Sequence, residues 1–575
     1  MKGYFIMFTE NRDGKYIVTT DAYQAIISEE CIDFVVGGAV VAGLRPASAV
    51  NTCGEGDAVI EDSDTAAAVL TATTENGLPT FVWTTSSTVW EKKEYIVRCY
   101  DEHFEYSIRV TGKGDVDTVN YFSGDLTKSN PGSNYEFDTG FTPIVTVTGQ
   151  TQCTFSAAQD NMNEFSYLMI PPMFVYSFTV KGVQDKVAFG LAADKGQHNF
   201  TQFNYKTKYD AHRRNFWFWT DQSGHTKVDG AWETPRILCY PAESDMDALK
   251  FYSDYYYSRG IANMKSASEE KPRFWYGPMA CGWVEQDAYS RNYGDAWGAC
   301  EKIYNHFVAQ MERVDLHPQI LIIDDKWQET YGDQYPNTNM FPDLRGFIDG
   351  MLENHNIHTM LWFKLWDSEG IPEDMCMWDP HDKKNVVDPT NPKFRAKLKE
   401  MLYKLLSSDE GCSNAWGLKL DYAFFQPVGR EAKSYDGRYG VELFLEYIKY
   451  IYECVKEIKP EAIVNASPCH PLFAEYVDHA RLHDYHFDLR RCYEEFIFRG
   501  ECYKIAMPNA LVDTDGAGFS SHRDTMRWMR LAHKIGIPDL YCFDNMPSIN
   551  ITDEDWAVVA RNWKAYSDKI DTMFR

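Results

Sequence analysis

The 575-residue sequence lacks several features that would each assign it to a class of protein. It has no run of about 20 apolar residues, so no membrane-spanning helix is expected. Its 14 cysteines include no Cys-x-x-Cys pair, and their spacing offers no zinc ligand set. It has neither Gly-x-Gly-x-x-Gly nor Gly-x-x-x-x-Gly-Lys-Ser/Thr, which disfavours the nucleotide-binding folds that depend on those loops.

Basic residues are scarce relative to acidic ones. The sequence has 57 Lys and Arg against 84 Asp and Glu, a net charge of −27. A surface of this sign repels a phosphate backbone, so a nucleic-acid partner is excluded. The apolar run Tyr4–Phe8 is too short for the core of a signal peptide, and the scattered cysteines suit free thiols. We therefore expect a cytoplasmic protein, and the sequence leaves open whether it forms a homo-oligomer.

Aromatic residues, by contrast, are abundant. They make up 15% of the chain, with 16 Trp, 36 Tyr and 34 Phe. Most of them are expected in the core, but flat rings also bind the apolar faces of ligands such as sugars.

The first part of the chain has the pattern of β-structure. Up to about Pro241, runs rich in Val, Ile, Thr, Tyr and Phe alternate with turn signals such as Asn76–Gly77, which predicts an antiparallel β-sandwich. A helix is expected over Met246–Ser258 and a linker over Lys265–Pro272. The expected strands include Tyr16–Thr20, Thr80–Thr85, Glu94–Cys99, Phe104–Val110, Pro143–Gly149 and Ser177–Val180.

From Arg273 onward, short apolar strands alternate with helical patterns, which is typical of a (β/α)8 TIM barrel. A doubly wound sheet is the alternative, but the expected phosphate loop is missing. We therefore predict a β-sandwich domain over 1–265 and a catalytic barrel over 266–575. The expected strands are Phe274–Trp283, Gln319–Asp325, Thr359–Trp366, Gly417–Phe424, Ala462–Ser467, His479–Asp484, Ile505–Val512 and Leu540–Phe543, and the expected helices include Asn391–Ser407, Arg438–Ile458, Ser521–Ile535 and Glu554–Asp568.

Acidic residues follow several of these strands, at the end of a barrel where catalytic groups lie. Lys419 and Asp421 are two apart on one strand, so both are expected to face the barrel mouth, with the lysine holding the carboxylate ionised. Asp484, two strands further round, is expected to face Asp421. Two carboxylates on opposite sides of a sugar ring are what glycoside hydrolysis requires. Asp513, Asp515 and Asp544 also follow strands, and turn chemistry explains the first two equally well.

The loop after the second barrel strand carries Asp324 and Asp325, both expected to bind ligand hydroxyls. Trp327 and Trp283, Trp362 and Trp366 place indole rings near strand ends, where they can stack on a sugar. A core role fits each of them about as well.

The segments Ile322–Gln328, Asp388–Pro392 and Gly417–Asp421 together resemble glycoside hydrolase family 36, the melibiase-type α-galactosidases and raffinose synthases. That family joins a β-sandwich to a (β/α)8 barrel, and those two parts cover nearly the whole chain. The resemblance implies a retaining mechanism with Asp421 as nucleophile and Asp484 as general acid/base. It further implies that Asp324 and Asp325 bind the 4- and 6-hydroxyls, Lys419 neighbouring hydroxyls, and Arg481 the 2-hydroxyl.

The chain departs from the family pattern at three places. Lys326 stands where the family usually has Gly, and Arg481 precedes Asp484 by three positions rather than four. Arg490 or Arg491 is an alternative for the arginine, and Asp488 for the acid. The family's small C-terminal β-domain has no counterpart after the last strand.

Three functions follow from this reading, none of them needing a metal or a cofactor. The first is a retaining α-galactosidase acting on an oligosaccharide or galactoside. The second is a transglycosidase or an α-glucosidase on the same barrel. The third is a relative that binds carbohydrate without cleaving it.

Overall fold

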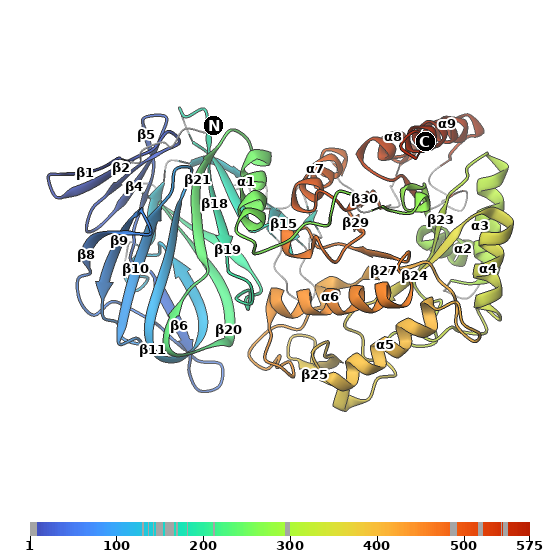
Figure 1. The fold of residues 1–575 in the computed structure, drawn as a ribbon, viewed down its shortest axis with the longest axis horizontal. Coiled ribbons are helices and arrows are strands. Elements are labelled where there is room, and N and C mark those ends of the chain that lie inside the picture. The colour runs from blue at the N-terminus through green and yellow to red at the C-terminus, as the bar shows by residue number, and fades with distance from the viewer. Residues whose placement is uncertain are drawn as a thin grey trace.

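The computed structural model describes residues 8–574, apart from 129–130, 136, 142, 145–152, 156–165, 168–170, 181, 211–212, 269, 294–298, 483–491, 516–520, 542 and 544–549. Figure 1 shows a large antiparallel β-domain on one side and a barrel of parallel strands and helices on the other, with helix α1 between them. The predicted fold class, a β-sandwich followed by a (β/α)8 barrel, is confirmed. None of the described helices combines the length and apolarity needed to cross a membrane.

The β-domain is built from long antiparallel strands whose alternate residues form the core. On β9, Phe81, Trp83 and Thr85 are buried while Val82 and Thr84 between them are partly exposed, as the period of two in a strand requires. In the described chain 18 strands join in one sheet, and 3 short ones, β14 (Pro143–Ile144), β15 (Cys153–Phe155) and β16 (Ser166–Tyr167), form another. The 18 are β1 (Phe8–Arg12), β2 (Lys15–Thr19), β3 (Gln24–Ile27), β4 (Ile32–Val36), β5 (Ala39–Leu44), β6 (Ala49–Cys53), β7 (Val59–Ile60), β8 (Val69–Glu75), β9 (Leu78–Thr85), β10 (Lys92–Cys99), β11 (Phe104–Tyr121), β12 (Ser133–Tyr135), β13 (Phe137–Phe141), β17 (Val175–Val180), β18 (Lys186–Ala192), β19 (Phe203–Asp210), β20 (Arg213–Glu233) and β21 (Arg236–Ala242).

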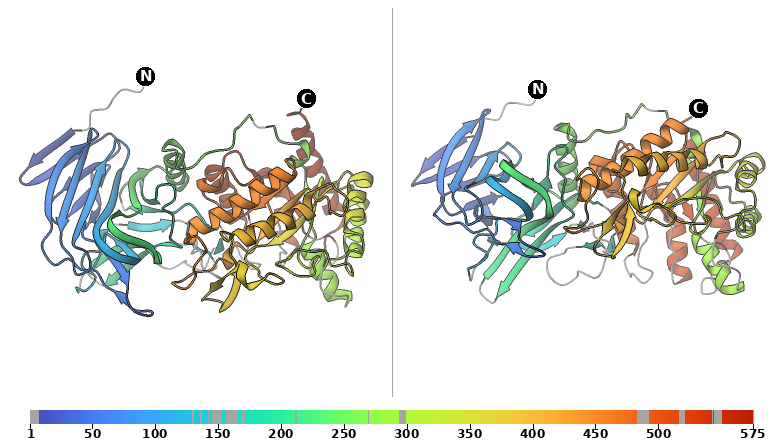
Figure 2. Two further views of the ribbon diagram at one scale, coloured as in Figure 1. Left: turned by 60° about the horizontal axis from the view of Figure 1, so that its bottom comes forward. Right: turned by 90° about the horizontal axis from the view of Figure 1, so that it is seen from below.

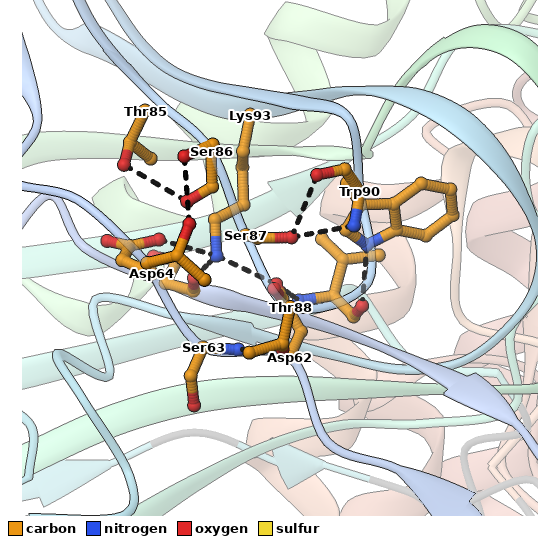
Figure 3. A network of polar contacts seen from close by, with 12 residues as sticks. Asp62, Ser63, Asp64, Thr85, Ser86, Ser87, Thr88, Trp90 and Lys93 are labelled. Carbon is orange, nitrogen blue, oxygen red and sulfur yellow. Dashed lines mark hydrogen bonds and ion pairs between the residues drawn. The ribbon is translucent and has the colours of Figure 1, made fainter.

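A buried lysine on β10 holds a neighbouring loop of this domain in place (Figure 3). The Lys93 ammonium on β10 lies 2.8 Å from carboxylate oxygens of both Asp62 and Asp64, and it donates to the Ser48 carbonyl at 3.0 Å. Tyr95, two residues along the same strand, donates to Asp64 at 2.7 Å. These contacts satisfy a charge that would otherwise be costly to bury, and they tie the segment after β7 to the sheet.

Helix α1 (Asp245–Ser258) joins the β-domain to the barrel, and Figure 2 shows it beside both. Ser244 caps its N-terminus by accepting from the Asp247 N–H. The Tyr252 hydroxyl bonds the Leu191 carbonyl at 2.7 Å and lies 3.0 Å from the His470 ring nitrogen of the barrel. Because one buried helix contacts both parts, the two parts form a continuous interior.

Eight parallel strands in the described chain form a nearly closed barrel, in the order β30-β29-β28-β27-β24-β23-β22-β31. At the junction of β30 and β31 the described residues show a single bridge, from Asp513 of β30 to Ile537, which precedes β31. The strands are β22 (Met279–Cys281), β23 (Ile320–Ile323), β24 (His358–Lys364), β27 (Gly417–Asp421), β28 (Ile463–Ala466), β29 (His479–Arg481), β30 (Leu511–Asp513) and β31 (Asp539–Leu540). Each of the eight lies within or beside its predicted range.

Helices cover the outside of the barrel. Helix α5 begins as predicted, with Asn391 as the N-cap, accepting from the Lys393 N–H, and Pro392 as the first helical residue. The predicted strand over Ile505–Val512 is shorter than expected because α7 continues through Ala506. The helices are α2 (Trp283–Tyr293), α3 (Glu301–Arg313), α4 (Leu344–His355), α5 (Pro392–Leu406), α6 (Gly440–Ile458), α7 (Cys492–Ala506), α8 (His522–Ile535) and α9 (Asp553–Asp571); β25 (Cys376–Asp379) and β26 (Lys384–Val387) form a hairpin, and η1 (Arg273–Tyr276), η2 (Glu373–Met375), η3 (Ala423–Phe425) and η4 (Pro471–Phe473) are 3-10 turns.

Candidate active site

Asp421 ends β27 at the C-terminal mouth of the barrel, with its side chain 17% exposed. Its oxygen Oδ1 accepts from the Tyr422 backbone N–H at 2.8 Å and from the Arg481 guanidinium at 2.8 Å. Its oxygen Oδ2 accepts from the Trp362 indole N–H at 3.0 Å. These donors favour the charged carboxylate and fix its orientation, while part of it stays open to the mouth.

Lys419 faces the same interior but does not pair with Asp421 as expected. Its ammonium lies 2.7 Å from Asp324 Oδ2 and donates to the Tyr541 hydroxyl at 3.1 Å. Burial lowers the pKa of Lys419, but the Asp324 carboxylate together with Cys281 and Asp515 offsets this and holds the pKa well above the usual range. The strand places Lys419 one layer deeper than Asp421, so the cation that meets Asp421 is Arg481, from β29.

Asp324 is held by several donors at the end of β23. Besides Lys419, the Cys281 thiol donates to its Oδ2 at 3.0 Å, and the Asp325 backbone N–H donates to its Oδ1 at 2.9 Å. Burial, followed by the Asp324 carboxylate, raises the pKa of Cys281 well above its usual range, which keeps it a thiol and a donor. Asp324 is therefore a rigid acceptor, 3% exposed.

Asp325 has spare accepting capacity. Its Oδ1 is buried and has no hydrogen-bond partner among the described residues. Burial and the neighbouring Asp324 charge raise its pKa, although a hydrogen bond with Tyr331 opposes the shift. A buried carboxylate oxygen without a donor is costly, so a ligand hydroxyl reaching it would be bound favourably.

The predicted tryptophans lie around these acids, mostly as walls. Trp327 is fully buried, and its indole N–H donates to the Trp362 carbonyl at 2.9 Å. Trp366 packs against Phe444 and Tyr447 of α6. Trp362 presents its N–H, rather than an open ring face, to Asp421. Trp283 is half-buried at the start of α2, directly after β22.

Four residues that follow strand ends hold left-handed backbone conformations. Their φ angles are +75° for Lys326, +64° for Trp366, +61° for Tyr422 and +50° for Asp515. Non-glycine residues adopt this region rarely, and such strain clusters at functional sites. The four positions follow β23, β24, β27 and β30, so the strained backbone marks the mouth of the barrel.

Sequence reasoning missed several residues of this centre. The Asp515 carboxylate lies 2.8 Å from Arg481 and also accepts from the Tyr541 hydroxyl. Tyr304 accepts from the Asp324 backbone N–H at 2.7 Å. Asp515 looked like a turn residue, and Tyr304 lies inside a helix where no strand-end pattern points to it. The position of Asp515 after a strand was the one available signal.

Some predicted residues lie outside the described part of the chain. Asp484, its rival Asp488, Arg490 and Arg491 fall in 483–491, and Asp544 falls in 544–549. Their roles stay predictions. Among the residues that are described, no group of three or more His, Cys, Asp or Glu side chains is arranged to hold a metal ion.

No protein-family model and no curated protein sequence matches this chain, but solved structures match its fold. The α-N-acetylgalactosaminidase NagBb from Bifidobacterium bifidum, a quadruple mutant, is 10% identical with a TM-score of 0.61, over 98% of this chain and 93% of that one. The α-galactosidase TtGalA from Thermus thermophilus, in complex with p-nitrophenyl α-D-galactopyranoside, is 13% identical with a TM-score of 0.50, over 86% and 95%.

A third match is the GH31 dextranase FjDex31A from Flavobacterium johnsoniae, complexed with glucose. It is 10% identical with a TM-score of 0.50, over 98% of this chain and 68% of that one. At these identities the likeness establishes architecture. The chain therefore has the fold of these proteins, an antiparallel β-domain joined to a (β/α)8 barrel.

Proposed function

We propose that this protein is a retaining glycoside hydrolase that removes terminal α-galactosyl units, with Asp421 as the nucleophile. The observation that carries the proposal is the setting of Asp421. It is a carboxylate at a barrel strand end, held by three donors and still 17% exposed. A nucleophile in double displacement must be ionised, oriented and reachable by the anomeric carbon.

The remaining groups fit a sugar pocket around that carboxylate. Asp324 and Asp325 supply acceptors for two neighbouring hydroxyls, and the free accepting capacity of Asp325 Oδ1 suits a hydroxyl donor. Asp484 is proposed as the general acid/base from the sequence resemblance. In this mechanism Asp421 attacks the anomeric carbon while Asp484 protonates the departing oxygen, and water then releases the sugar with Asp484 as base.

Mechanism-based labelling tests the nucleophile. A fluorinated α-galactoside slows release of the covalent intermediate, so the wild-type protein should gain the mass of one glycosyl unit. Digestion and mass spectrometry should place that mass on the peptide containing Asp421. Label on another carboxylate would contradict the assignment, and Asp421→Asn provides the unlabelled control.

The second candidate is an α-glucosidase. The specific observation in its favour is the match to a dextranase complexed with glucose, at the same TM-score as the α-galactosidase TtGalA. Hydrolysis of p-nitrophenyl α-galactoside and α-glucoside at equal concentration separates the two. Faster release from the glucoside would favour this candidate, and analysis of sugar products would reveal transglycosylation.

A further inference from the structure

Arg481 is shared between two carboxylates. One terminal nitrogen lies 2.8 Å from Asp421 Oδ1 and the other lies 2.8 Å from Asp515 Oδ2. The Arg481 side chain is 1% exposed and that of Asp515 is fully buried. A guanidinium presents its donors in a rigid plane, so holding one nitrogen on Asp515 fixes where the other points.

Asp515 is in turn anchored on several sides. Its backbone N–H donates to Asp513 Oδ1 at 2.8 Å, and its Oδ1 accepts from the Tyr541 hydroxyl. That hydroxyl is also 3.1 Å from the Lys419 ammonium, which is paired with Asp324. A continuous series of polar contacts therefore runs across the barrel from Asp421 to the proposed hydroxyl-binding acid.

The position of Asp515 has an electrostatic consequence for Asp421. When Asp421 attacks, its negative charge is lost to an ester, so a full uncompensated cation beside it would oppose the reaction. The Asp515 carboxylate balances part of the Arg481 charge. It is also a like charge behind the nucleophile, which disfavours the ionised form of Asp421 and makes it a stronger base.

We propose that Asp515 is a positioning residue that orients Arg481 and adjusts the charge on the nucleophile Asp421. The inference rests on the proposed function, since it concerns the group that attacks. Asp515 is fully buried and pairs directly with Arg481, so we assign it a role through Arg481 rather than as a catalytic residue.

Replacing Asp515 by Asn tests the electrostatic part while keeping the shape. The amide oxygen can still accept from Arg481, but the negative charge is gone. Asp421 should then release its proton at lower pH, because a neighbouring like charge has been removed. The acid limb of kcat/KM should move to lower pH and kcat should fall about tenfold to a hundredfold, with KM changed less.

The protonation of Asp421 is also followed directly, in the absence of substrate turnover. Aspartate carboxyl carbons are labelled with 13C, and the Asp421 signal is identified as the one missing from Asp421→Asn. Its midpoint should be lower in Asp515→Asn than in the wild type. Glu446→Gln is the matched control: it removes a carboxylate that pairs with Arg395 on the outer helices, and the midpoint should not move.

An unchanged Asp421 midpoint in folded Asp515→Asn would overturn the proposal, whatever happens to activity or thermal stability. If Asp515→Asn does not fold, Tyr541→Phe is used: it keeps the charge but removes one donor to Asp515, and it should move the midpoint upward. An unchanged Asp421 midpoint in Tyr541→Phe would likewise overturn the proposal. A wild-type protein that cleaves no α-glycoside contradicts the proposed function alone, because the titration does not depend on cleavage.

Discussion

The short strand β29 has opposite charge arrangements at its two ends. Asp478, just before it, lies between two cations, Lys265 and Lys456, whereas Arg481, its last residue, lies between two anions, Asp421 and Asp515. At the first end both carboxylate oxygens are satisfied, with the Val464 N–H donating to Oδ2 at 2.9 Å. At the second end the shared cation holds a carboxylate that remains partly exposed.

The pKa shifts follow the same contrast. Burial raises the pKa of Asp478, but its two lysine partners more than offset this and bring it below the ordinary value. Burial and then the Asp515 charge raise the pKa of Asp513, the last residue of β30, to about 6, and burial raises the pKa of Asp539, the first residue of β31, well above the ordinary range. The Asp478 end of β29 is thus balanced by cations, whereas Asp513, paired with Arg481 at the other end, keeps a raised pKa of the kind that clusters at functional sites.

The largest expected effect comes from neutralising Asp421 at the mouth. Asp421→Asn should lower kcat by about 10⁴-fold or more, because the proposed nucleophile is lost. Its thermal unfolding midpoint should stay close to that of the wild type, since Arg481 retains Asp515 as a partner. Steady-state kinetics and calorimetry check both parts. Activity within tenfold of the wild type would contradict the expectation that the Arg481 end of β29, unlike the Asp478 end, serves catalysis.

Neutralising Asp478 should have the converse effect. Asp478→Asn removes the carboxylate that pairs with the buried Lys265 and the partly exposed Lys456, which should lower the free energy of unfolding by about 3 kcal/mol. The kcat of the folded fraction should stay within about twofold of the wild type, because Asp478 lies at the other end of the strand. Denaturant titration and active-site counting measure the two quantities. A lower kcat at normal stability would argue against a purely structural role.

The smallest effect is a pH dependence of stability carried by Asp513. Its folded pKa of about 6 exceeds the ordinary value of 3.8, so the folded state binds the proton more tightly than the unfolded state. Stability is therefore lost as pH rises from about 4 through 6. Asp513→Asn should remove that loss.

The change in the free energy of unfolding that Asp513→Asn causes should differ between the two pH values. It should favour the variant by about 2 kcal/mol more at pH 7.5 than at pH 4.5. The amide can still accept from Asp515, and the unpartnered Asn465 Oδ1 offers an acceptor for the new N–H. Urea unfolding at the two pH values gives the comparison. An equal change in the free energy of unfolding at both pH values would mean that Asp513 does not titrate in this range.

Much of the fold could be predicted because hydrophobic periodicity is local. Alternation on strands such as β9 and the helix start at Asn391–Pro392 both depend on neighbouring residues only. The same local rule placed Lys419 and Asp421 on one face of β27. It could not tell which cation would meet Asp421, since Lys419 and Arg481 come from different strands and the choice depends on depth in the barrel.

The tryptophans likewise show what local sequence patterns cannot predict. Their places near strand ends were predictable, but whether a ring faces ligand or core depends on what packs over it. Trp366, for example, is covered by Phe444 and Tyr447 from a helix some 80 residues later. The contact between Asp515 and Tyr541 could not be predicted for the same reason. Tyr541 follows β31, whereas Asp515 follows β30, across the junction of these two strands, which we call the barrel seam.

That seam has a consequence for motion. In the described residues one bridge, Asp513 to Ile537, joins β30 to the segment before β31, whereas β24 and β27 are paired at four positions. Backbone amides at the seam should exchange with deuterium before those of the opposite wall, since opening there breaks fewer bonds. Asp513 and Asp539 flank this seam, so their deprotonation adds repulsion where the wall is weakest. The barrel wall should therefore open preferentially between β30 and β31, and more often above about pH 6 than below it.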